Sequence, residues 1–433
     1  MRKIFLIDDT VVNKISYYHL VCFLLSLPFD FFYSEIILIS FGLHTIIHAK
    51  KMALKNILSV PVLILVSVYL LGLLAMVYSP DKAEAINVAT RQLAILIIPV
   101  LFAISSLNFK KYTPNLVCVF GFGCAATILY LYATALHTII SSGLPLSSLF
   151  SGQFMNHKFA APVKLHATYL SMYTTFSLLA FLYLLLSYRS LQYRWLYITC
   201  AVILTAGMLQ LSSRAVFISF LVIINLVFPF VIYTGKKRVT FFITSCIISA
   251  AAIVAIFSLD SFKERYISEL KTDLSDTHET IENVEPRLTR WDAIMELVKI
   301  SPVIGYGSGS EKELLKQKYF EKKLFISYLN EFNAHNEYLS ITIKTGIIGL
   351  ALMLYVLYCG FNKAIQKRDT LFLIFMALIS IVFISENVLD LNKGIFFYSF
   401  FFSLFFIDQS ASVTGNSMDL TNKPGNRDLI LNV

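Results

Sequence analysis

The stretch FNAHNEYLS at residues 332–340 sets a histidine and two asparagines directly before a long apolar run. Histidine titrates near neutral pH and is able to take a proton from a hydroxyl. Three arginines elsewhere in the chain, Arg214, Arg287 and Arg290, carry planar forks of donors that fit a phosphate group. If His335 and these arginines meet, their residue types favour a site that holds a diphosphate and activates a hydroxyl.

Four further polar residues are second-rank candidates for the same site: His166, Arg91, Glu386 and Asn336. Each candidate also has a structural explanation. Arg214 can anchor at the membrane surface, Arg91 can cap a helix or form a structural pair, and Arg287 and Arg290 can lie on the solvated face of a helix. A histidine can be an interface residue. Glu386 can pair with an arginine, and Asn336 fits the N-cap position of the helix that follows it.

The composition is typical of a membrane protein. Hydrophobic residues make up 57% of the 433 residues and charged residues 15%, with a mean hydropathy of +0.70, whereas soluble domains carry about 25% charged residues. The net charge of +9 is distributed over short connectors, so a nucleic-acid partner is not expected. All six cysteines fall in apolar runs, which argues against disulfides and zinc sites.

Apolar runs of about 20 residues predict membrane-spanning helices. The chain has about twelve such runs, so we predict an all-α polytopic membrane protein surrounded by membrane lipids. The predicted spans cover roughly residues 14–30, 32–49, 57–78, 86–107, 115–140, 167–187, 194–211, 214–234, 239–259, 337–360, 370–387 and 394–408.

Basic connectors orient these spans. Lys50, Lys51 and Lys55 follow the second span, and Lys236 and Lys237 follow the eighth, while the alternate loops are poor in basic residues. The positive-inside rule then predicts that both termini lie in the cytoplasm. The N-terminus lacks the features of a cleavable signal peptide, so the first span is expected to remain in the protein.

This topology divides the chain into four parts. We predict a membrane domain over 1–259 with nine spans, a large outer loop over 260–335, and a second membrane domain over 336–408 with three spans. The tail over 409–433 is predicted to be cytoplasmic and disordered.

The large outer loop is predicted to contain short helices. One should begin near Pro286 and run through RLTRWDAIMELVKI, because the apolar residues of this stretch recur at helical spacing. Arg287 and Arg290 would then share one helix face. The first half of the loop is acidic, and the run GYGSG at 305–309 is interpreted as a flexible turn.

The predicted topology collects the candidate residues at the outer membrane surface. Arg214, His166 and His335 lie at outer ends of spans, and Arg287 and Arg290 lie in the outer loop. Ionisable residues at membrane depth are costly and often mark function. Since no DxD pair or His/Cys cluster offers a metal site, the arginines would neutralise a lipid diphosphate there without a metal ion or another cofactor.

The order of these motifs resembles the O-antigen ligase and O-antigen polymerase superfamily of bacterial envelope glycosyltransferases. The resemblance covers about residues 160–400, and the N-terminal third is similar only as a series of spans. Each motif is weak alone, but their combination in this order is specific. The matching pieces are HATYL at 166–170, SSRA at 212–215, RLTRW at 287–291, SPVIGYGSG at 301–309, AHNEYL at 334–339 and TGIIGL at 345–350.

The resemblance implies a metal-independent transferase in the bacterial inner membrane with its active site facing the periplasm. It would move a glycan from an undecaprenyl diphosphate carrier to a hydroxyl of lipid A–core or of another glycan, alongside envelope polysaccharide assembly proteins. It implies that His335 is the base or orients the acceptor. Arg214 and one or both of Arg287 and Arg290 would bind the diphosphate.

Two alternatives remain open. A ligase transfers a finished chain, whereas a repeat-unit polymerase joins units that are both lipid-linked; the superfamily name favours the first and the HATYL element the second. A transporter or flippase of lipid-linked sugars would also have many spans and a polar cavity. Transporters, however, tend to place their polar residues near the midplane of the membrane rather than at one face.

Overall fold

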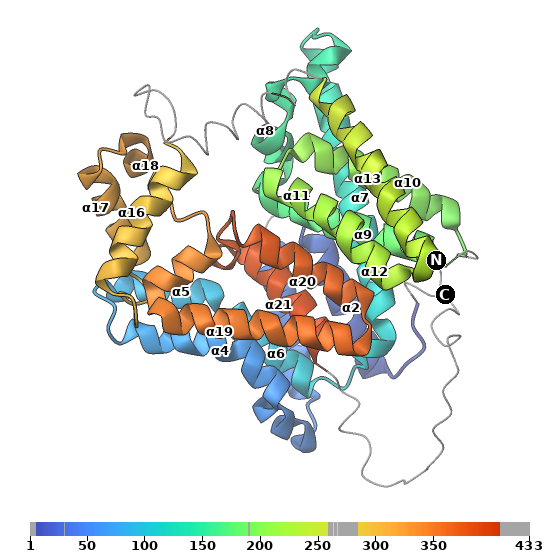
Figure 1. Cartoon of the computed structure of the whole chain (residues 1–433). Helices are drawn as coiled ribbons and strands as arrows, with labels where there is room; N and C mark the ends of the chain where they lie inside the picture. Colours follow the sequence, from blue (N-terminus) through green and yellow to red (C-terminus); the bar gives the residue numbers. More distant parts are fainter. Residues whose placement is uncertain are drawn as a thin grey trace.

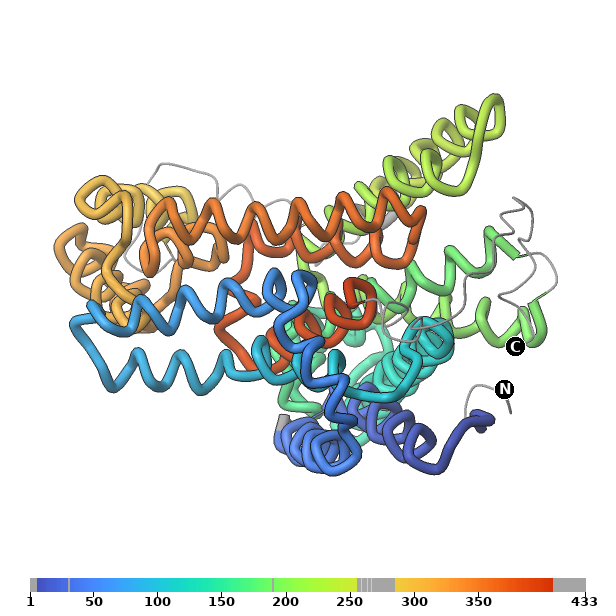
Figure 2. Tube along the Cα trace, turned by 90° about the horizontal axis from the view of Figure 1, so that it is seen from below, coloured from blue at the N-terminus to red at the C-terminus, as the bar shows by residue number. Residues whose placement is uncertain are grey.

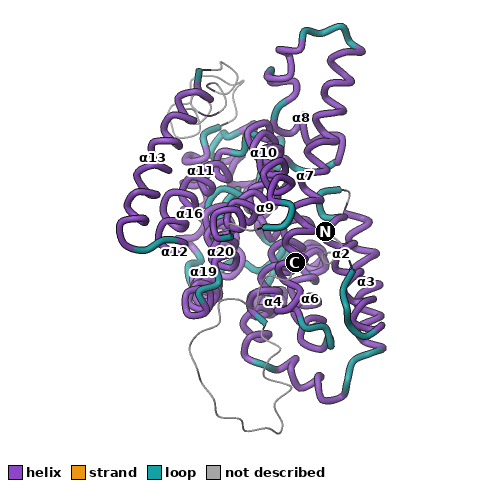
Figure 3. The backbone as a smooth tube through the Cα atoms, turned by 90° about the vertical axis from the view of Figure 1, so that its right-hand side faces the viewer, coloured by secondary structure: helices purple, strands orange, loops and turns teal. Residues whose placement is uncertain are grey.

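A computed structural model describes residues 6–29, 31–188, 191–258, 263, 266 and 285–407. Within these residues the chain is helical and contains no strand, which confirms the all-α prediction (Figures 1 and 3). The tail over 409–433 and nearly all of the acidic half of the large loop, residues 264–282, lie outside the described residues. What the sequence predicts for them stays a prediction.

The helices follow one another from the N-terminal to the C-terminal part of the described chain. The first half contains α2 (Val11–Ser26), α3 (Phe31–Ile47), α4 (Val60–Met76), α5 (Lys82–Gln92), α6 (Ala94–Ile104), α7 (Phe109–Ser141), α8 (Asn156–Ala160) and α9 (Ala167–Ser187). The second half contains α10 (Arg194–Leu211), α11 (Arg214–Val222), α12 (Phe228–Ile232), α13 (Gly235–Phe257), α16 (Arg287–Ile300), α17 (Glu311–Glu321), α18 (Phe325–Leu329), α19 (Glu337–Lys367), α20 (Thr370–Val382) and α21 (Asn392–Phe406). Short 3-10 turns join several of them, among them η1 (Lys51–Leu58), η2 (Leu146–Phe150) and η7 (Val388–Asp390).

Seven helical stretches among the described residues are long and apolar enough to cross a membrane. They are Lys82–Ile104, Phe109–Ser141, Ala167–Ser187, Arg194–Leu211, Arg214–Ile232, Gly235–Val254 and Glu337–Lys367. The pair η1 and α4, bent by 57°, would add an eighth. The chain is therefore an integral membrane protein, as its composition indicates.

The remaining predicted spans contain shorter helices. These are α2 with 16 residues, α3 with 17, α20 with 13 and α21 with 15. α21 is almost entirely buried by other helices. Polar backbone beyond the ends of a short helix is tolerated at membrane depth where protein covers it. The total of twelve spans remains a prediction.

Side-chain caps define where several helices begin. The Asp81 carboxylate accepts the N–H of Glu84 at the start of α5, and the Asp369 carboxylate accepts that of Phe372 at the start of α20. Such caps satisfy donors that the first helical turn leaves without a partner. They explain why short polar residues stand immediately before the apolar runs in the sequence.

Phenylalanine rings fill the centre of the helix bundle. Phe176 of α9 and Phe401 of α21 have ring centroids 4.8 Å apart in an edge-to-face arrangement, and Phe397 lies 5.0 Å from Phe401. Aromatic pairs favour this geometry, which adds to the benefit of burying their area. The high phenylalanine content therefore serves packing between α9, α20 and α21.

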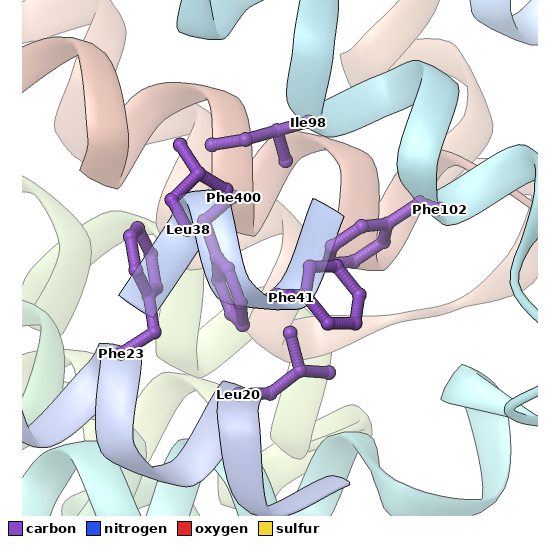
Figure 4. Close-up of a pocket in the computed structure, with 7 residues that line it drawn as sticks. All are labelled: Leu20, Phe23, Leu38, Phe41, Ile98, Phe102 and Phe400. Carbon is purple, nitrogen blue, oxygen red and sulfur yellow. The ribbon is translucent and has the colours of Figure 1, made fainter. Parts of the chain in front are cut away.

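A second aromatic group joins α2, α3, α6 and α21. Figure 4 shows Phe23, Phe41, Phe102 and Phe400 around a small apolar space. Its volume of about 10 Å³ is close to the room of one water molecule. This space is a packing gap rather than a ligand site.

The helices α16, α17 and α18 form a separate small unit, called here the α16–α18 unit. It gathers at one end of the long α19 (Figure 2). Its apolar residues, among them Ile294, Leu315 and Tyr319, are buried against Ala334 and Ile343. The helix predicted from Pro286 is confirmed, with Pro286 itself one position before the first helical residue.

The GYGSG run differs from the flexible turn predicted for it. The backbone N–H groups of Tyr306 and Gly307 donate to the carbonyls of Ile343 and Lys344, each over 2.9 Å. These carbonyls are accessible because α19 is broken at Gly346, where φ is +65°. A Cβ at Gly305, whose φ is +67°, would lie 2.4 Å from the Ile343 oxygen. The GYGSG run is therefore held closely against the backbone of α19 by hydrogen bonds and is not a loose linker.

Candidate functional site

Several helix ends meet around a cavity of about 250 Å³. The ends belong to α8, α9, α11 and α16, and they are joined by the segments that precede α19 and follow α20. The candidate residues that line the cavity are His166, Arg214, Arg287, His335 and Glu386. Residues more than 200 positions apart in the sequence, such as His166 and Glu386, thus share one site. The lining does not include Arg290, Asn336 or Arg91.

His335 is held in a left-handed backbone conformation with φ of 44°. Its N–H donates to the Asn333 side chain over 3.0 Å, and its ring lies edge-on to Phe332 at 5.7 Å. About a quarter of its side chain is exposed. Non-glycine residues in this conformation are uncommon and recur at functional sites. The arrangement turns the imidazole toward the cavity at the point where α19 begins.

Glu386 faces His335 across the cavity wall. Its Oε2 lies 3.6 Å from Nδ1 of His335, and its Oε1 accepts a hydrogen bond from the Thr168 hydroxyl over 3.3 Å. Burial opposes ionisation of this carboxyl, but the interaction with His335, together with the charge of Arg287, lowers its pKa below the ordinary value. The carboxylate is therefore ionised at neutral pH and stabilises positive charge on the imidazole.

Asn336 caps α19 and connects it to the segment after α20. Its side-chain oxygen accepts the N–H of Leu339 over 3.1 Å. Its own N–H donates over 2.8 Å to the side chain of Asn387. The residue next to the histidine therefore fixes where the helix starts, and through this the position of His335.

Arg287 and Arg290 lie one turn apart on α16 but have different surroundings. Arg287 lines the cavity, and its Nη1 donates to the Ser385 carbonyl over 3.1 Å. Arg290 is only 5% exposed, and its guanidinium lies over the Phe332 ring at 5.2 Å. Arg287 thus lines the cavity, whereas Arg290 packs beneath the segment that carries His335.

Arg214 is the first residue of α11. The chain reaches it through Ser212, whose backbone is left-handed with φ of 48°, and Ser213, which lies at the N-cap position. The positive end of the α11 dipole therefore adds to the charge of the Arg214 side chain at the cavity. Both effects favour an anion there.

His166 caps α9 with its ring. Its Nδ1 accepts the N–H of Thr168 over 3.4 Å, and its ring contacts that of His157 edge-on at 4.2 Å. Burial lowers its pKa to about 4, although the carboxylate of Glu386 opposes the shift. His166 is therefore neutral at pH 7 and offers the cavity a polar ring without charge.

Arg91 lies on α5 and forms an ion pair with Glu84 over 2.9 Å. Its side chain is 43% exposed. Such a pair on one helix stabilises the helix modestly. The structural explanation for Arg91 agrees with this contact.

Some residues at the site were not among the sequence candidates. His157, Thr168 and Trp291 line the cavity, and the indole N–H of Trp291 donates to the Ala334 carbonyl over 3.0 Å. Thr168 and Trp291 belong to the motifs HATYL and RLTRW. Membership of these motifs is the signal in the sequence that could have indicated them as site residues. Among the described residues, no group of three or more His, Cys, Asp or Glu side chains is arranged to hold a metal ion.

Comparison with known proteins adds two findings. Residues 199–354, from α10 into α19, match a family model described as O-antigen ligase. This stretch includes Arg214, Arg287, Arg290 and His335. A protein of Haemophilus influenzae, described as uncharacterized, is 29% identical over 122 residues. That similarity covers 26% of this chain and 31% of the length of the relative.

Proposed function

Since the chain belongs to the O-antigen ligase superfamily through residues 199–354, we propose that it transfers a glycan from an undecaprenyl diphosphate carrier to an acceptor hydroxyl. The acceptor would be lipid A–core or another glycan, and the reaction would take place at the periplasmic face of the bacterial inner membrane. The observation that carries this proposal is the meeting of His335 and Glu386 with Arg214 and Arg287 around one cavity.

The proposed reaction is a displacement at the anomeric carbon. The acceptor oxygen attacks this carbon while its proton passes to His335, and the bond between the carbon and the diphosphate oxygen breaks. The electron pair leaves with the diphosphate, whose charge Arg214 and Arg287 stabilise. Attack opposite the leaving group inverts the anomeric centre. Glu386 stabilises the imidazolium that forms and holds the ring in place.

The lipid part of such a donor requires an apolar surface near the diphosphate site. A mainly apolar cavity of about 280 Å³ lies between α10, α11 and α13, lined by residues such as Phe217, Leu221 and Ile248. α11 contributes to both cavities, with Arg214 and Ile218 at the polar one. We propose that the polyprenyl chain lies in the apolar cavity.

The test is transfer by the purified protein from a lipid-linked glycan to an acceptor in the absence of any ion gradient. Product formation excludes a function in transport alone. The His335→Ala variant is expected to lose at least about 100-fold in kcat, since general-base catalysis contributes about 100- to 10,000-fold. Unchanged transfer by this variant would rule out the role proposed for His335.

A ligase and a polymerase are distinguished by the envelope glycans of a strain that lacks this protein. Full-length chains that remain on the carrier identify a ligase. Single repeat units attached to the acceptor identify a polymerase, which is the function that the HATYL motif at the start of α9 favours. We propose the ligase as the first candidate.

A further inference from the structure

A buried polar cluster lies beside the proposed active site but does not line its cavity. It contains Glu311 at the start of α17, Lys344 of α19, and Asn387 and Asp390 between α20 and α21. Glu311, Lys344 and Asn387 are 5%, 8% and 2% exposed. Buried charges persist in folded proteins when they are paired and hydrogen-bonded.

Hydrogen-bond donors surround both carboxylate oxygens of Glu311. Its Oε1 accepts the N–H of Ala334 over 3.1 Å and the amide N–H of Asn387 over 3.2 Å. Its Oε2 accepts the Ser340 hydroxyl and lies 2.9 Å from Nζ of Lys344. Only a group that accepts on both oxygens satisfies these four donors, and an ionised carboxylate is such a group.

Two routes lead from this carboxylate to His335. The first is direct, because Ala334 immediately precedes His335 in the chain. The second passes through Asn387, which accepts the N–H of Asn336 over 2.8 Å and follows Glu386 in the chain. Glu311 therefore fixes the backbone on both sides of His335 and the segment that carries its carboxylate partner.

Lys344 completes the cluster by holding two acidic residues. Its Nζ lies 2.9 Å from Glu311 and also 2.9 Å from Oδ1 of Asp390. The other oxygen of Asp390 accepts the amide of Asn387 over 2.8 Å. Each charged group of the cluster thus has an opposite charge or a donor facing it, and the set connects α17, α19 and the segment after α20.

From these contacts we infer that Glu311 is a positioning residue, which couples the α16–α18 unit to His335 and Glu386. The inference rests on the proposed function, because it concerns the group that receives the acceptor proton. Loss of the α17 contact would release residues 332–340 and misplace the imidazole without removing any group that contacts the donor.

The test compares the full-length Glu311→Gln variant with Glu331→Gln in detergent or nanodiscs. Glutamine keeps the shape of the side chain but directs an NH₂ group at donors. Glu331 follows α18 and makes exposed ion pairs with Lys312 and Lys316 of α17. Hydrogen–deuterium exchange over residues 332–340 and the separate kcat and donor KM values are measured.

We expect faster exchange over 332–340 and a kcat about 100-fold lower for Glu311→Gln, with little change in donor KM, because small misplacements of a reacting group have effects of this order. Glu331→Gln should resemble the unmodified protein in both measurements. Unchanged exchange or unchanged kcat in Glu311→Gln would overturn the inference.

Two further comparisons keep the test decisive. If Glu311→Gln does not fold, Ser340→Ala removes one donor to the same carboxylate and should increase exchange in the same segment to a smaller extent; no increase would overturn the inference. If the unmodified protein transfers no glycan, the proposed function fails, and if His335→Ala retains full transfer, only the role of His335 fails. In both cases the exchange measurements still decide whether Glu311 holds the segment.

Discussion

At the scale of single residues, the two arginines of the RLTRW motif have different environments. Arg287 reaches the cavity and holds the Ser385 carbonyl, while Arg290 is buried against the Phe332 ring. We therefore propose that Arg287 contacts the diphosphate, and that Arg290 supports the segment leading to His335. The sequence placed both on one helix face, and the resemblance gave the diphosphate to one or both of them without saying which.

This division can be tested with Arg287→Lys and Arg290→Lys. Lysine keeps the charge but lacks the planar fork, so Arg287→Lys should raise the donor KM or lower kcat by about 10- to 100-fold, as expected for one lost charge-assisted hydrogen bond. Arg290→Lys should mainly lower the Tm, because the buried guanidinium packing is lost. If Arg290→Lys weakens donor binding as strongly as Arg287→Lys at an unchanged Tm, the roles assigned here are wrong.

At the scale of helices and loops, the α16–α18 unit is attached to α19 largely through backbone groups. The carbonyls of Ile343 and Lys344 receive two N–H groups from the GYGSG run, and the N–H of Ile347 donates to the Pro302 carbonyl over 2.8 Å. The break at Gly346 makes this exchange possible. A helix that looks continuous in the sequence pattern is therefore the docking surface for the unit.

Gly305→Ala should destabilise the protein more than Gly143→Ala. Both glycines have positive φ, of +67° and +64°, but only Gly305 is close to other backbone atoms, with Ile343 O 2.4 Å from the position of a Cβ. Gly143→Ala should reduce the free energy of unfolding by about 1 kcal/mol, the cost of the left-handed conformation. Gly305→Ala should reduce it by about 3 kcal/mol because the clash adds to that cost.

The measurement is thermal unfolding of both variants in the same detergent. Equal shifts in Tm would mean that the loop can move away from α19 at no cost. The close fit of the GYGSG run would then not contribute to stability.

The sequence predicted the helices well where length and capping agree. The predicted spans 167–187 and 194–211 coincide with α9 and α10, because their apolar runs end at polar or basic residues. The docking of the GYGSG run was not predicted, since its partners lie about 40 residues later and backbone hydrogen bonds leave no side-chain signature. The prediction of a flexible turn at 305–309 rested on the local sequence, in which glycine is frequent.

The candidate site was partly predictable for a similar reason. His335, Arg214 and Arg287 stand out because charged residues beside apolar runs are conspicuous. Glu311 does not, since it lies in a hydrophilic segment among other charges, and its partner Asn387 is 76 positions away. Only the folded chain shows that this glutamate is buried while Lys312 and Glu313, which follow it, are exposed.

At the scale of the whole molecule, the proposal requires the α16–α18 unit and the cavity to face the periplasm. This can be tested with single cysteines in a variant from which the six native cysteines have been removed. Lys299 on α16 and Lys51 in η1 are both exposed and lie on predicted opposite sides. A membrane-impermeant thiol reagent should label Lys299→Cys in cells with a permeabilised outer membrane, and Lys51→Cys only after lysis.

The reverse labelling pattern would place the cavity on the cytoplasmic side and exclude a periplasmic transfer reaction. Labelling of both positions before lysis would contradict the predicted number of spans between them. Either result would require another donor or another topology for the same site.

The backbone character of the contact between the GYGSG run and α19 has a consequence for divergence among related proteins. Main-chain groups make this contact, and the two residues just before the run, Val303 and Ile304, have exposed side chains, 55% and 51%. Both can therefore be replaced without removing the backbone hydrogen bonds to α19. The close approach of the backbone restricts Gly305 and Gly307 to glycine. The exposed side chains of the segment are constrained mainly by what surrounds the protein. The attachment can thus survive while the surface of the unit changes to suit a different acceptor.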